Sequence, residues 1–195
     1  MKLVALSQRV DTFPDRNETR DTLDQRLLAW VDSCGYMPVP VPNTRGSAPW
    51  NWLAAVEPGA VVLSGGNDIG KCPERDYTER VLLDYAHERQ LPVLGICRGM
   101  QMMAVWAGAR LHPVSGHLQA RHELAGLIST EVNSYHSYSI TDCPDAFEVL
   151  ARSEDGEIEA IRHRSLPWEG WMWHPERERH FAVHDADRIK ELFCR

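Results

Sequence analysis

Two kinds of apolar pattern alternate along the first half of the chain. Short, almost wholly apolar runs predict buried β-strands, and they are Leu3–Leu6, Met37–Val41, Ala60–Leu63 and Pro92–Ile96. Longer segments in which apolar side chains return every three or four positions predict helices, and they are Thr19–Cys34, Glu74–Arg89 and Gly99–Ala107. Because strands and helices alternate, we expect an α/β fold with a mainly parallel sheet.

Glycines and prolines mark the ends of several of these segments. Gly35 and Gly108 follow two predicted helices, as glycine commonly does at a helix C-terminus. The prolines of Met37–Val41 place that strand near an edge, because proline cannot donate a hydrogen bond to a neighbouring strand. We expect a loop over Pro42–Trp52, with a short helix after it.

The pattern changes beyond Arg110. Strand-like segments separated by turns such as Asp155-Gly156 replace the alternation, and they are Thr130–Ile140, Phe147–Ala151, Glu157–His163 and Gly170–Trp173. Pro113–Leu127 is expected to be irregular. A closing helix is expected over Asp185–Phe193, with Asp185 or Asp187 as its N-cap. No repeat is visible, so we expect one domain over residues 1–195.

Composition narrows the class of protein. The 195 residues are 43% hydrophobic and 25% charged, which excludes a disordered chain, a collagen and a coiled coil. No apolar run approaches the roughly 20 residues of a membrane helix, and Met1–Leu6 is too short for the apolar region of a signal peptide. We therefore expect a cytoplasmic protein with no membrane partner. The odd number of cysteines, 5, and the absence of a Cys-x-x-Cys pair predict neither a disulfide framework nor a zinc site.

The charge balance bears on the kind of partner. Lys and Arg number 21 and Asp and Glu 28, so the net charge is −7 with neutral histidines. An acidic protein is not expected to bind nucleic acid non-specifically. A local basic pocket could still hold a small anionic molecule.

The segment Pro92–Gln101 carries the sharpest chemical signal. A buried strand runs into Gly95-Ile-Cys97-Arg-Gly99, and a predicted helix follows at once. This is the glycine-flanked nucleophile elbow with cysteine in the place of serine. The glycines permit a tight turn, and the helix N-terminus favours the reactive thiolate. A single cysteine after a strand is usually a core residue, but this context favours a nucleophile.

A thiolate nucleophile needs a base and an orienting group. Among the 9 histidines, His174 stands out because Glu176 lies two positions further on. In an extended segment these side chains project to the same side, so the carboxylate can orient the imidazole. A charged surface loop is an equally good explanation of this segment taken alone.

Paired glycines follow the third predicted strand, in Ser64-Gly65-Gly66-Asn67. They are typical of a tight turn. Parallel sheets also bind ligands at this edge, so a backbone N–H here could form an oxyanion hole with the N–H of Arg98.

Together, the elbow around Cys97, the later His174-Pro-Glu176 and the upstream Ser-Gly-Gly resemble the class I glutamine amidotransferase family across most of the chain. The resemblance implies a flavodoxin-like three-layer sandwich, a Cys-His-Glu triad and a γ-glutamyl thioester intermediate. It also implies oxyanion-binding N–H groups at Gly66 and Arg98, with no metal or organic cofactor.

Further positions of that family carry over to the chain. Gln101 would hold the amino-acid end of the glutamyl group. The segment His136-Ser137-Tyr138 is similar to one whose backbone grips the α-carboxylate. Without the resemblance, polar alternation over residues 133–140 indicates only a half-buried strand.

The family contains free-standing hydrolases of γ-glutamyl conjugates and glutaminase subunits that feed ammonia to a synthase. Arg98 resembles the hydrolases, and residues 17–21 and 132–138 resemble a branch with a nucleotide-linked substrate from capsular polysaccharide biosynthesis. The expected partner is a small γ-glutamyl conjugate bearing a pyrophosphate-type anion. Candidate cations for it are Arg9, Arg20, Arg121 and His122, each of which alone is better explained as solvated charge.

Three alternatives stay open at this point. The chain could be a glutaminase subunit with a separate synthase, a hydrolase of another γ-glutamyl amine, or a binding module that kept the elbow without its chemistry. The sequence leaves the oligomeric state undetermined.

Overall fold

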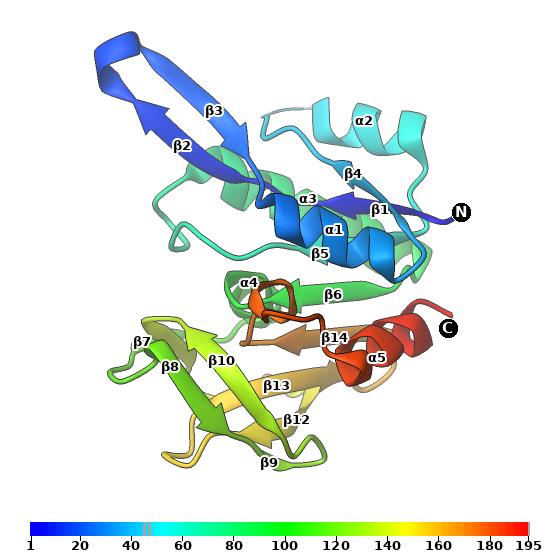
Figure 1. Cartoon of the computed structure of the whole chain (residues 1–195). Coiled ribbons are helices and arrows are strands. Elements are labelled where there is room, and N and C mark those ends of the chain that lie inside the picture. The colour runs from blue at the N-terminus through cyan, green and yellow to red at the C-terminus, as the bar shows by residue number, and fades with distance from the viewer. Residues whose placement is uncertain (45, 47, 195) are drawn as a thin grey trace.

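The computed structural model describes residues 1–44, 46 and 48–194, and within them an eight-stranded sheet runs through the molecule (Figure 1). Its strands, in spatial order, are β4 (Met37–Pro40), β1 (Leu3–Leu6), β5 (Ala60–Leu63), β6 (Val93–Ile96), β14 (Trp168–Trp171), β13 (Ile158–His163), β12 (Phe147–Arg152) and β9 (Ala125–Gly126). The pairings from β4 to β14 are parallel, and those from β14 to β9 are antiparallel. The mainly parallel α/β fold is confirmed, with β4 at the predicted edge.

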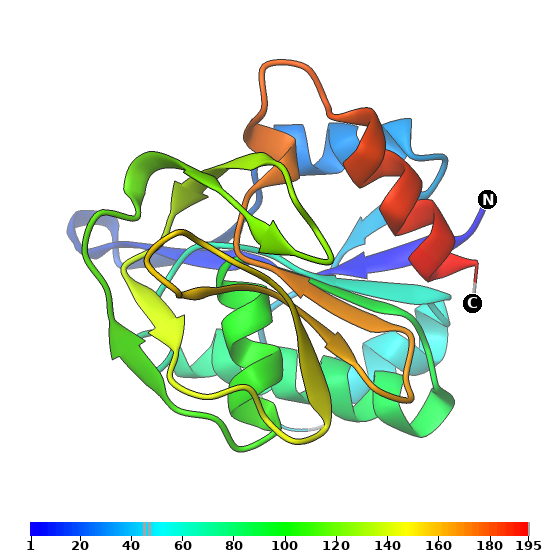
Figure 2. The same ribbon diagram turned by 90° about the horizontal axis from the view of Figure 1, so that it is seen from below.

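Helices cover both faces of this sheet and make three layers (Figure 2). On one face lie α1 (Gln25–Ser33) and α5 (Val183–Phe193), and on the other lie α2 (Ala48–Val56), α3 (Pro73–Arg89) and α4 (Arg98–Trp106). Alternate strand residues reach opposite layers: Val4 and Leu6 pack with α1 and α5, whereas Ala5 packs with α2, α3 and α4. Neither face is exposed to water, which explains why the parallel strands are apolar throughout.

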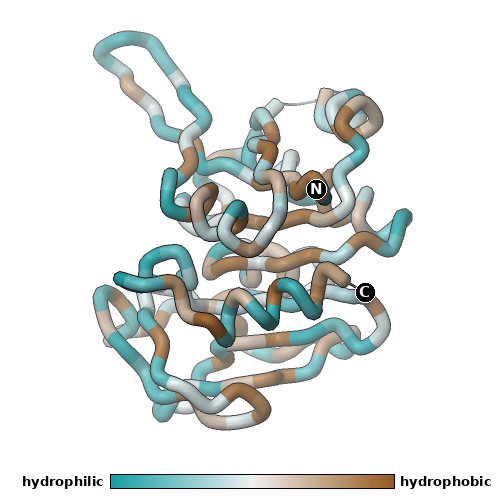
Figure 3. The backbone as a smooth tube through the Cα atoms, turned by 45° about the vertical axis from the view of Figure 1, so that its right-hand side comes forward, coloured by the Kyte–Doolittle hydropathy of each residue, from teal (hydrophilic) through white to brown (hydrophobic). Residues whose placement is uncertain are grey.

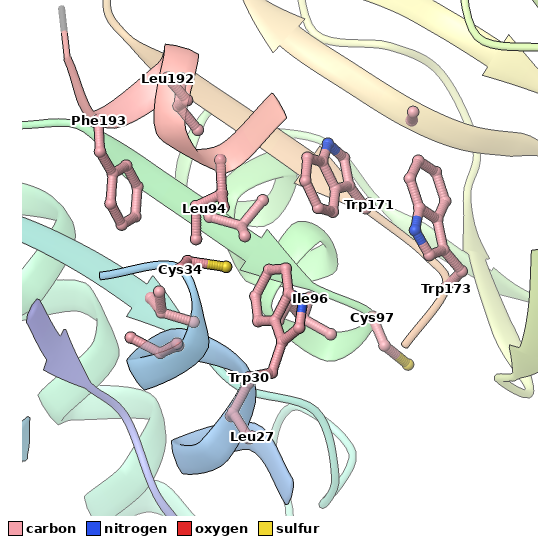
Figure 4. Close-up of a cluster of buried hydrophobic side chains, with 14 of the residues drawn as sticks. Leu27, Trp30, Cys34, Leu94, Ile96, Cys97, Trp171, Trp173, Leu192 and Phe193 are labelled. Atoms are coloured by element: carbon pink, nitrogen blue, oxygen red, sulfur yellow. The ribbon is translucent and has the colours of Figure 1, made fainter. Parts of the chain in front are cut away.

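Tryptophans fill the layer beside the end of β6 (Figure 4). Trp171 stacks on Trp173 with ring centroids 5.2 Å apart, and Trp30 meets Trp171 edge-on at 6.4 Å. Cys97 lies at the end of this cluster, with its sulfur directed away from it. The cluster therefore supports the position of Cys97 from one side.

Additional strand pairs lie at the carboxyl ends of the parallel strands. One is the hairpin of β2 (Arg9–Phe13) and β3 (Glu18–Thr22), joined by the 3₁₀ turn η1 (Pro14–Arg16). Its tip projects from the body and is hydrophilic (Figure 3). Across the same edge lie two antiparallel pairs, β8 (Leu118–Glu123) with β10 (Glu131–Tyr135), and β7 (Leu111–Pro113) with β11 (Tyr138–Ile140). None of the described helices is long and apolar enough to cross a membrane.

Two predicted boundaries in the N-terminal half are wrong. Residues 19–22, predicted as the start of a helix, belong to β3, and α1 begins only at Gln25. Asp24 sets that start, because its carboxylate accepts the N–H of Arg26 at 2.8 Å. The helix expected after the Pro42–Trp52 loop begins earlier, at Ala48, and residues 45 and 47 lie outside the described part of the chain.

The second half differs more from the expectation. The stretch Pro113–Leu127 contains β8 and β9 rather than irregular chain, because β8 pairs with β10 and β9 with β12. The local pattern does not show them, since β8 is mostly polar and β9 has two residues. The strand predicted over Thr130–Ile140 is interrupted after Tyr135. The closing helix begins at Val183 with Ala182 as its N-cap, so neither Asp185 nor Asp187 caps it. Asp185 is buried in its first turn and accepts a hydrogen bond from Trp173 Nε1 at 3.3 Å.

Candidate active site

Cys97 occupies a strained turn between β6 and α4. Its backbone has φ 51° and ψ −106°, and its N–H donates to the carbonyl of Trp171 at 2.6 Å. Positive φ is rare for residues other than glycine and occurs preferentially at functional sites. A Cβ on Gly99 would lie 2.2 Å from the carbonyl oxygen of Leu63, and one on Gly95 would lie 2.5 Å from Met103 Sδ. Both glycines of the predicted elbow are therefore required by packing.

The imidazole of His174 lies between Cys97 and Glu176. Its Nδ1 is 2.6 Å from Glu176 Oε1, at the start of the 3₁₀ turn η2 (Pro175–Arg177), and the Cys97 side chain lies close enough to the imidazole to raise its pKa. Burial lowers the pKa of His174, but the hydrogen bonds and negative charges of Cys97 and Glu176 outweigh burial and raise this pKa to about 9. The structure thus brings together the three residues predicted as a triad.

The amide of Asn133, on β10, fixes the backbone of His174 from both sides. Asn133 Oδ1 accepts the N–H of His174 at 2.9 Å, and Nδ2 donates to the carbonyl of His174 at 2.8 Å. Nδ2 also donates to Glu178 Oε1 at 2.8 Å. Asn133 was not predicted from the sequence, because nothing in a polar–apolar strand pattern connects it with a histidine 41 residues away.

The turn after β5 lies against the same imidazole. Gly66 has φ +84°, and a Cβ on Gly65 would lie 2.5 Å from His174 Cε1. Gly66, Cys97 and Arg98 line one cavity. The N–H of Arg98 is in the first turn of α4, where a helix offers no acceptor for it. Gly66 and Arg98, the residues expected to form an oxyanion hole, thus lie with Cys97 at this cavity.

A buried ionic network on α3 orients this turn. Arg75 Nη2 donates to the carbonyl oxygens of Ser64 at 2.7 Å and Gly65 at 3.0 Å, and Nη1 donates to the carbonyl of Gly66. Because three successive carbonyls face Arg75, they are directed away from the reacting centre. No sequence pattern indicates this arrangement, since a charged face of a helix is normally exposed.

Glu79 completes that network and is fully buried. It accepts hydrogen bonds from Arg75 Nε at 3.0 Å, from the Arg98 guanidinium and from Ser7 Oγ at 2.8 Å. Burial raises the pKa of Glu79, but the charges of Arg98 and Arg75 outweigh it and hold the pKa below its usual value. The side chain of Arg98 therefore anchors the elbow, while its N–H remains directed at the site.

A small cavity of 90 Å³ lies on one side of Cys97. The sequence-predicted residues that line it are Gly66, Cys97, Arg98, Gln101, His136, Ser137 and Tyr138. Gln101 Nε2 donates to the carbonyl of Tyr138 at 2.8 Å, so it fixes the segment it was predicted to work with. Both ring nitrogens of His136 have protein partners, which leaves the backbone of this segment as its binding element.

A second cavity, of 260 Å³, lies on the other side of His174, beneath the β2–β3 hairpin. Arg9 and Arg177 are its cationic lining residues, and Asp11, Asp24 and Glu176 are its acidic ones. Arg9 Nε donates to Asp11 Oδ1 at 3.1 Å. Of the four cations considered from the sequence, only Arg9 lines this cavity. Arg121 is bound to Glu131 and Glu178, and Arg20 to Glu18 on the hairpin. His122 packs on the ring of His117.

Comparisons with known proteins assign the chain to a family. The model of the family "Glutamine amidotransferase class-I" matches residues 20–185. γ-Glutamyl-CDP-amidate hydrolase of Campylobacter jejuni subsp. jejuni serotype O:2 is 34% identical over 143 residues, which are 69% of this chain and 69% of that protein. A glutamine-hydrolyzing GMP synthase subunit of Methanosarcina barkeri is 36% identical over 146 residues, 70% of this chain and 72% of that protein.

A solved structure gives the same picture of the fold. The crystal structure of a candidate GMP synthase subunit from Thermoplasma acidophilum superposes with a TM-score of 0.75 at 20% identity, covering 100% of this chain and 94% of that one. At this identity the likeness speaks for the fold alone. With a family match over most of the chain, a shared fold and relatives above 30% identity, the protein belongs to the class-I glutamine amidotransferase family.

Proposed function

We propose that the protein is a cysteine-dependent γ-glutamyl hydrolase whose triad is Cys97, His174 and Glu176. The observation that carries this proposal is the placing of His174, hydrogen-bonded to Glu176, next to Cys97 at the junction of two cavities. A nucleophile, a base and an orienting carboxylate in contact form the arrangement that acyl transfer requires. The small cavity has room for a glutamyl group, and the larger one for its leaving group.

The reaction proceeds in two halves. The Cys97 thiolate attacks the γ-carbonyl carbon and forms a C–S bond, while the N–H groups of Gly66 and Arg98 bind the oxyanion. His174 gives its proton to the departing nitrogen as the C–N bond breaks. His174 then takes a proton from water, which attacks the thioester carbonyl, and the C–S bond breaks to release glutamate. Glu176 holds the imidazole in place through both halves.

Two guanidinium groups of the larger cavity, those of Arg9 and Arg177, offer donors to an anionic leaving group, because guanidinium groups suit phosphate oxygens. A bound phosphate would compete for them with the carboxylates of Asp11 and Glu176, with which they are paired. One relative is named for hydrolysis of γ-glutamyl-CDP-amidate. We infer that this chain hydrolyses γ-glutamyl-CDP-amidate to glutamate and cytidine diphosphoramidate.

The second candidate is a glutaminase subunit that delivers ammonia to a synthase. It is favoured by the similarity to the GMP synthase subunit of Methanosarcina barkeri, which the chain covers about as fully as it covers the hydrolase. Such a protein would release glutamate from glutamine slowly by itself and faster with its synthase. The two candidates share the triad and differ in what occupies the larger cavity.

Glutamate release by the purified protein alone separates the two candidates. L-Glutamine, a simple γ-glutamyl amine and γ-glutamyl-CDP-amidate are compared at equal concentrations. If the protein is the hydrolase, it should strongly prefer the nucleotide conjugate. Arg9→Gln should then raise the KM for γ-glutamyl-CDP-amidate more than the KM for L-glutamine. Arg20→Gln, on the exposed hairpin, is the control and should change neither. Equal, feeble rates on all three substrates would contradict the hydrolase and favour the glutaminase subunit.

A further inference from the structure

A second group of reactive side chains lies behind the small cavity. His117 precedes β8, His136 lies between β10 and β11, and Glu159 belongs to β13. Their exposed fractions are 1%, 3% and 0%. The triad chemistry does not use these side chains, and they come from three segments that are separate in the sequence.

Three ligand-type atoms of this group form a nearly equilateral triangle. His117 Nδ1 lies 3.1 Å from His136 Nε2 and 3.3 Å from Glu159 Oε1. The third side, from His136 Nε2 to Glu159 Oε1, is 3.2 Å. Around a four-coordinate zinc ion with bonds of about 2.0–2.1 Å, neighbouring ligand atoms lie about 3.3 Å apart.

The outer hydrogen bonds of both imidazoles determine which nitrogens carry protons. His136 Nδ1 is 3.0 Å from the carbonyl oxygen of Tyr138, and His117 Nε2 is 2.8 Å from Asp155 Oδ2. A carbonyl and a carboxylate only accept hydrogen bonds, so these two nitrogens donate. In the neutral rings, the inner nitrogens then present lone pairs to each other and to the carboxylate of Glu159.

Three electron-pair donors in a dry site repel one another unless a cation lies between them. Glu159 Oε2 adds a fourth donor, because it is buried and has no hydrogen-bond partner among the described residues. Histidines that donate their outer N–H to a carbonyl or carboxylate are typical of metal ligands. Two imidazoles and a carboxylate suit zinc and its neighbours among the divalent transition metals.

We propose that His117 Nδ1, His136 Nε2 and Glu159 Oε1 bind one divalent transition-metal ion of the zinc type, with Glu159 Oε2 available for the fourth position. The ion would join β13 to the β8–β10 pair, in which the N–H of His136 already donates to the carbonyl of His117 at 3.1 Å. Since Ser137 and Tyr138 follow a ligand directly and line the small cavity, the ion fixes the backbone on which the glutamyl group would rest. The ion stabilises the fold and takes no part in the reaction of Cys97.

The sequence predicted no metal because it lacks the cysteine spacing of zinc sites. The three ligands are 19 and 23 residues apart in the chain, with no recognisable motif. Only the fold brings them together.

Metal content tests the proposal directly. The full-length protein is stripped with a chelator, given Zn²⁺ or Co²⁺, dialysed and analysed by elemental mass spectrometry and absorption. We expect one ion per chain. The absorption spectrum should show the d–d bands of Co²⁺ with nitrogen and oxygen ligands and no thiolate charge-transfer band. The Tm should fall by about 5 °C or more after stripping. Glu159→Gln and His117→Ala should each weaken Co²⁺ binding at least 100-fold.

Two variants distinguish this site from other places on the chain. Cys97→Ala should keep its metal, because the thiol is not a ligand. His112→Gln removes the half-exposed His112–Glu157 pair nearby and should also keep it. Wild-type protein that takes up neither ion, with a Tm unaffected by chelator, would overturn the proposal. A proton shared by the three side chains would then explain their close approach. Loss of the metal in Cys97→Ala would also overturn it.

Discussion

The side chains next to His174 raise the pKa of its imidazole. The Cys97 thiol and the Glu176 carboxylate favour its protonated form more than burial opposes it. A raised pKa means that folding stabilises the imidazolium. Its contribution to stability is full below the ordinary histidine pKa of 6.5 and is lost as the pH rises through about 9. At neutral pH the proton needed by the leaving nitrogen is therefore already in place.

The first prediction is a pH dependence. We expect kcat/KM for glutamate release to fall as the pH rises through about 9, because His174 then loses the proton that it gives to the leaving group. In the Cys97→Ala variant, an NMR titration of the His174 ring should give a lower pKa than in the wild type, since both contributions of Cys97 are gone. An unchanged pKa in this variant would contradict contact between the two side chains.

The second prediction concerns Gly65. A Cβ there would lie 2.5 Å from His174 Cε1, and the ring cannot easily yield because Glu176 and Asn133 hold it. We expect Gly65→Ala to lower kcat about 100-fold, as a displacement of about 1 Å in a catalytic group can do, while the circular dichroism spectrum is retained.

Gly59→Ala is the matched control for Gly65→Ala. Its new Cβ meets only the flexible side chain of Lys2, at 2.8 Å and far from the site. Full activity in Gly65→Ala would mean that the imidazole is free to move.

At the scale of elements, α3 supports catalysis without touching substrate. Its residues Arg75 and Glu79 connect the turn after β5 with the first residue of α4 through a buried chain of ion pairs. Gly66 and Arg98, the two residues proposed to bind the oxyanion, are thus both held from one helix. Removing one member leaves the others charged and buried, which costs more than the pair gains by forming.

The third prediction follows from this network. Glu79→Gln keeps the shape of the side chain but leaves the buried guanidinium of Arg75 without a carboxylate and that of Arg98 with Asp76 alone. We expect the free energy of unfolding to fall by about 3–5 kcal/mol, measured by urea denaturation, together with a lower kcat.

Glu148→Gln provides the comparison for that variant. It breaks the partly exposed pair with Arg162 on the antiparallel strands and should cost at most about 1 kcal/mol. Equal losses in the two variants would contradict a special role for Glu79.

Elements that bury apolar side chains could be predicted, and short polar strands could not. The apolar runs of β1, β5 and β6, and the helix after Cys97, were predicted close to their observed bounds. The strands β2, β3 and β8 were missed, because they are short, polar and stabilised by pairing rather than by burial. The contacts of Asn133 and Arg75 were missed because each joins a side chain to backbone carbonyls of another segment, which no sequence pattern shows.

At the scale of the whole molecule, the layers place the elbow where two cavities meet. The parallel strands deliver Cys97 and the turn after β5 to one edge, and β14 brings the chain that continues to His174 beside β6. The mainly parallel sheet and the candidate triad could be predicted because the elbow and the His-Pro-Glu segment are local motifs. The β2–β3 hairpin and the antiparallel pairs β8–β10 and β7–β11 contribute to the walls of the two cavities. These elements have no local sequence motif.

Glutamate release from γ-glutamyl-CDP-amidate by the wild type and by Cys97→Ala, measured side by side on proteins of equal Tm, tests the central claim most directly. The thioester mechanism predicts turnover by the wild type and none above background by Cys97→Ala. Release by Cys97→Ala at a rate near that of the wild type would contradict it, since Cys97 is the only thiol among the described residues that line the two cavities.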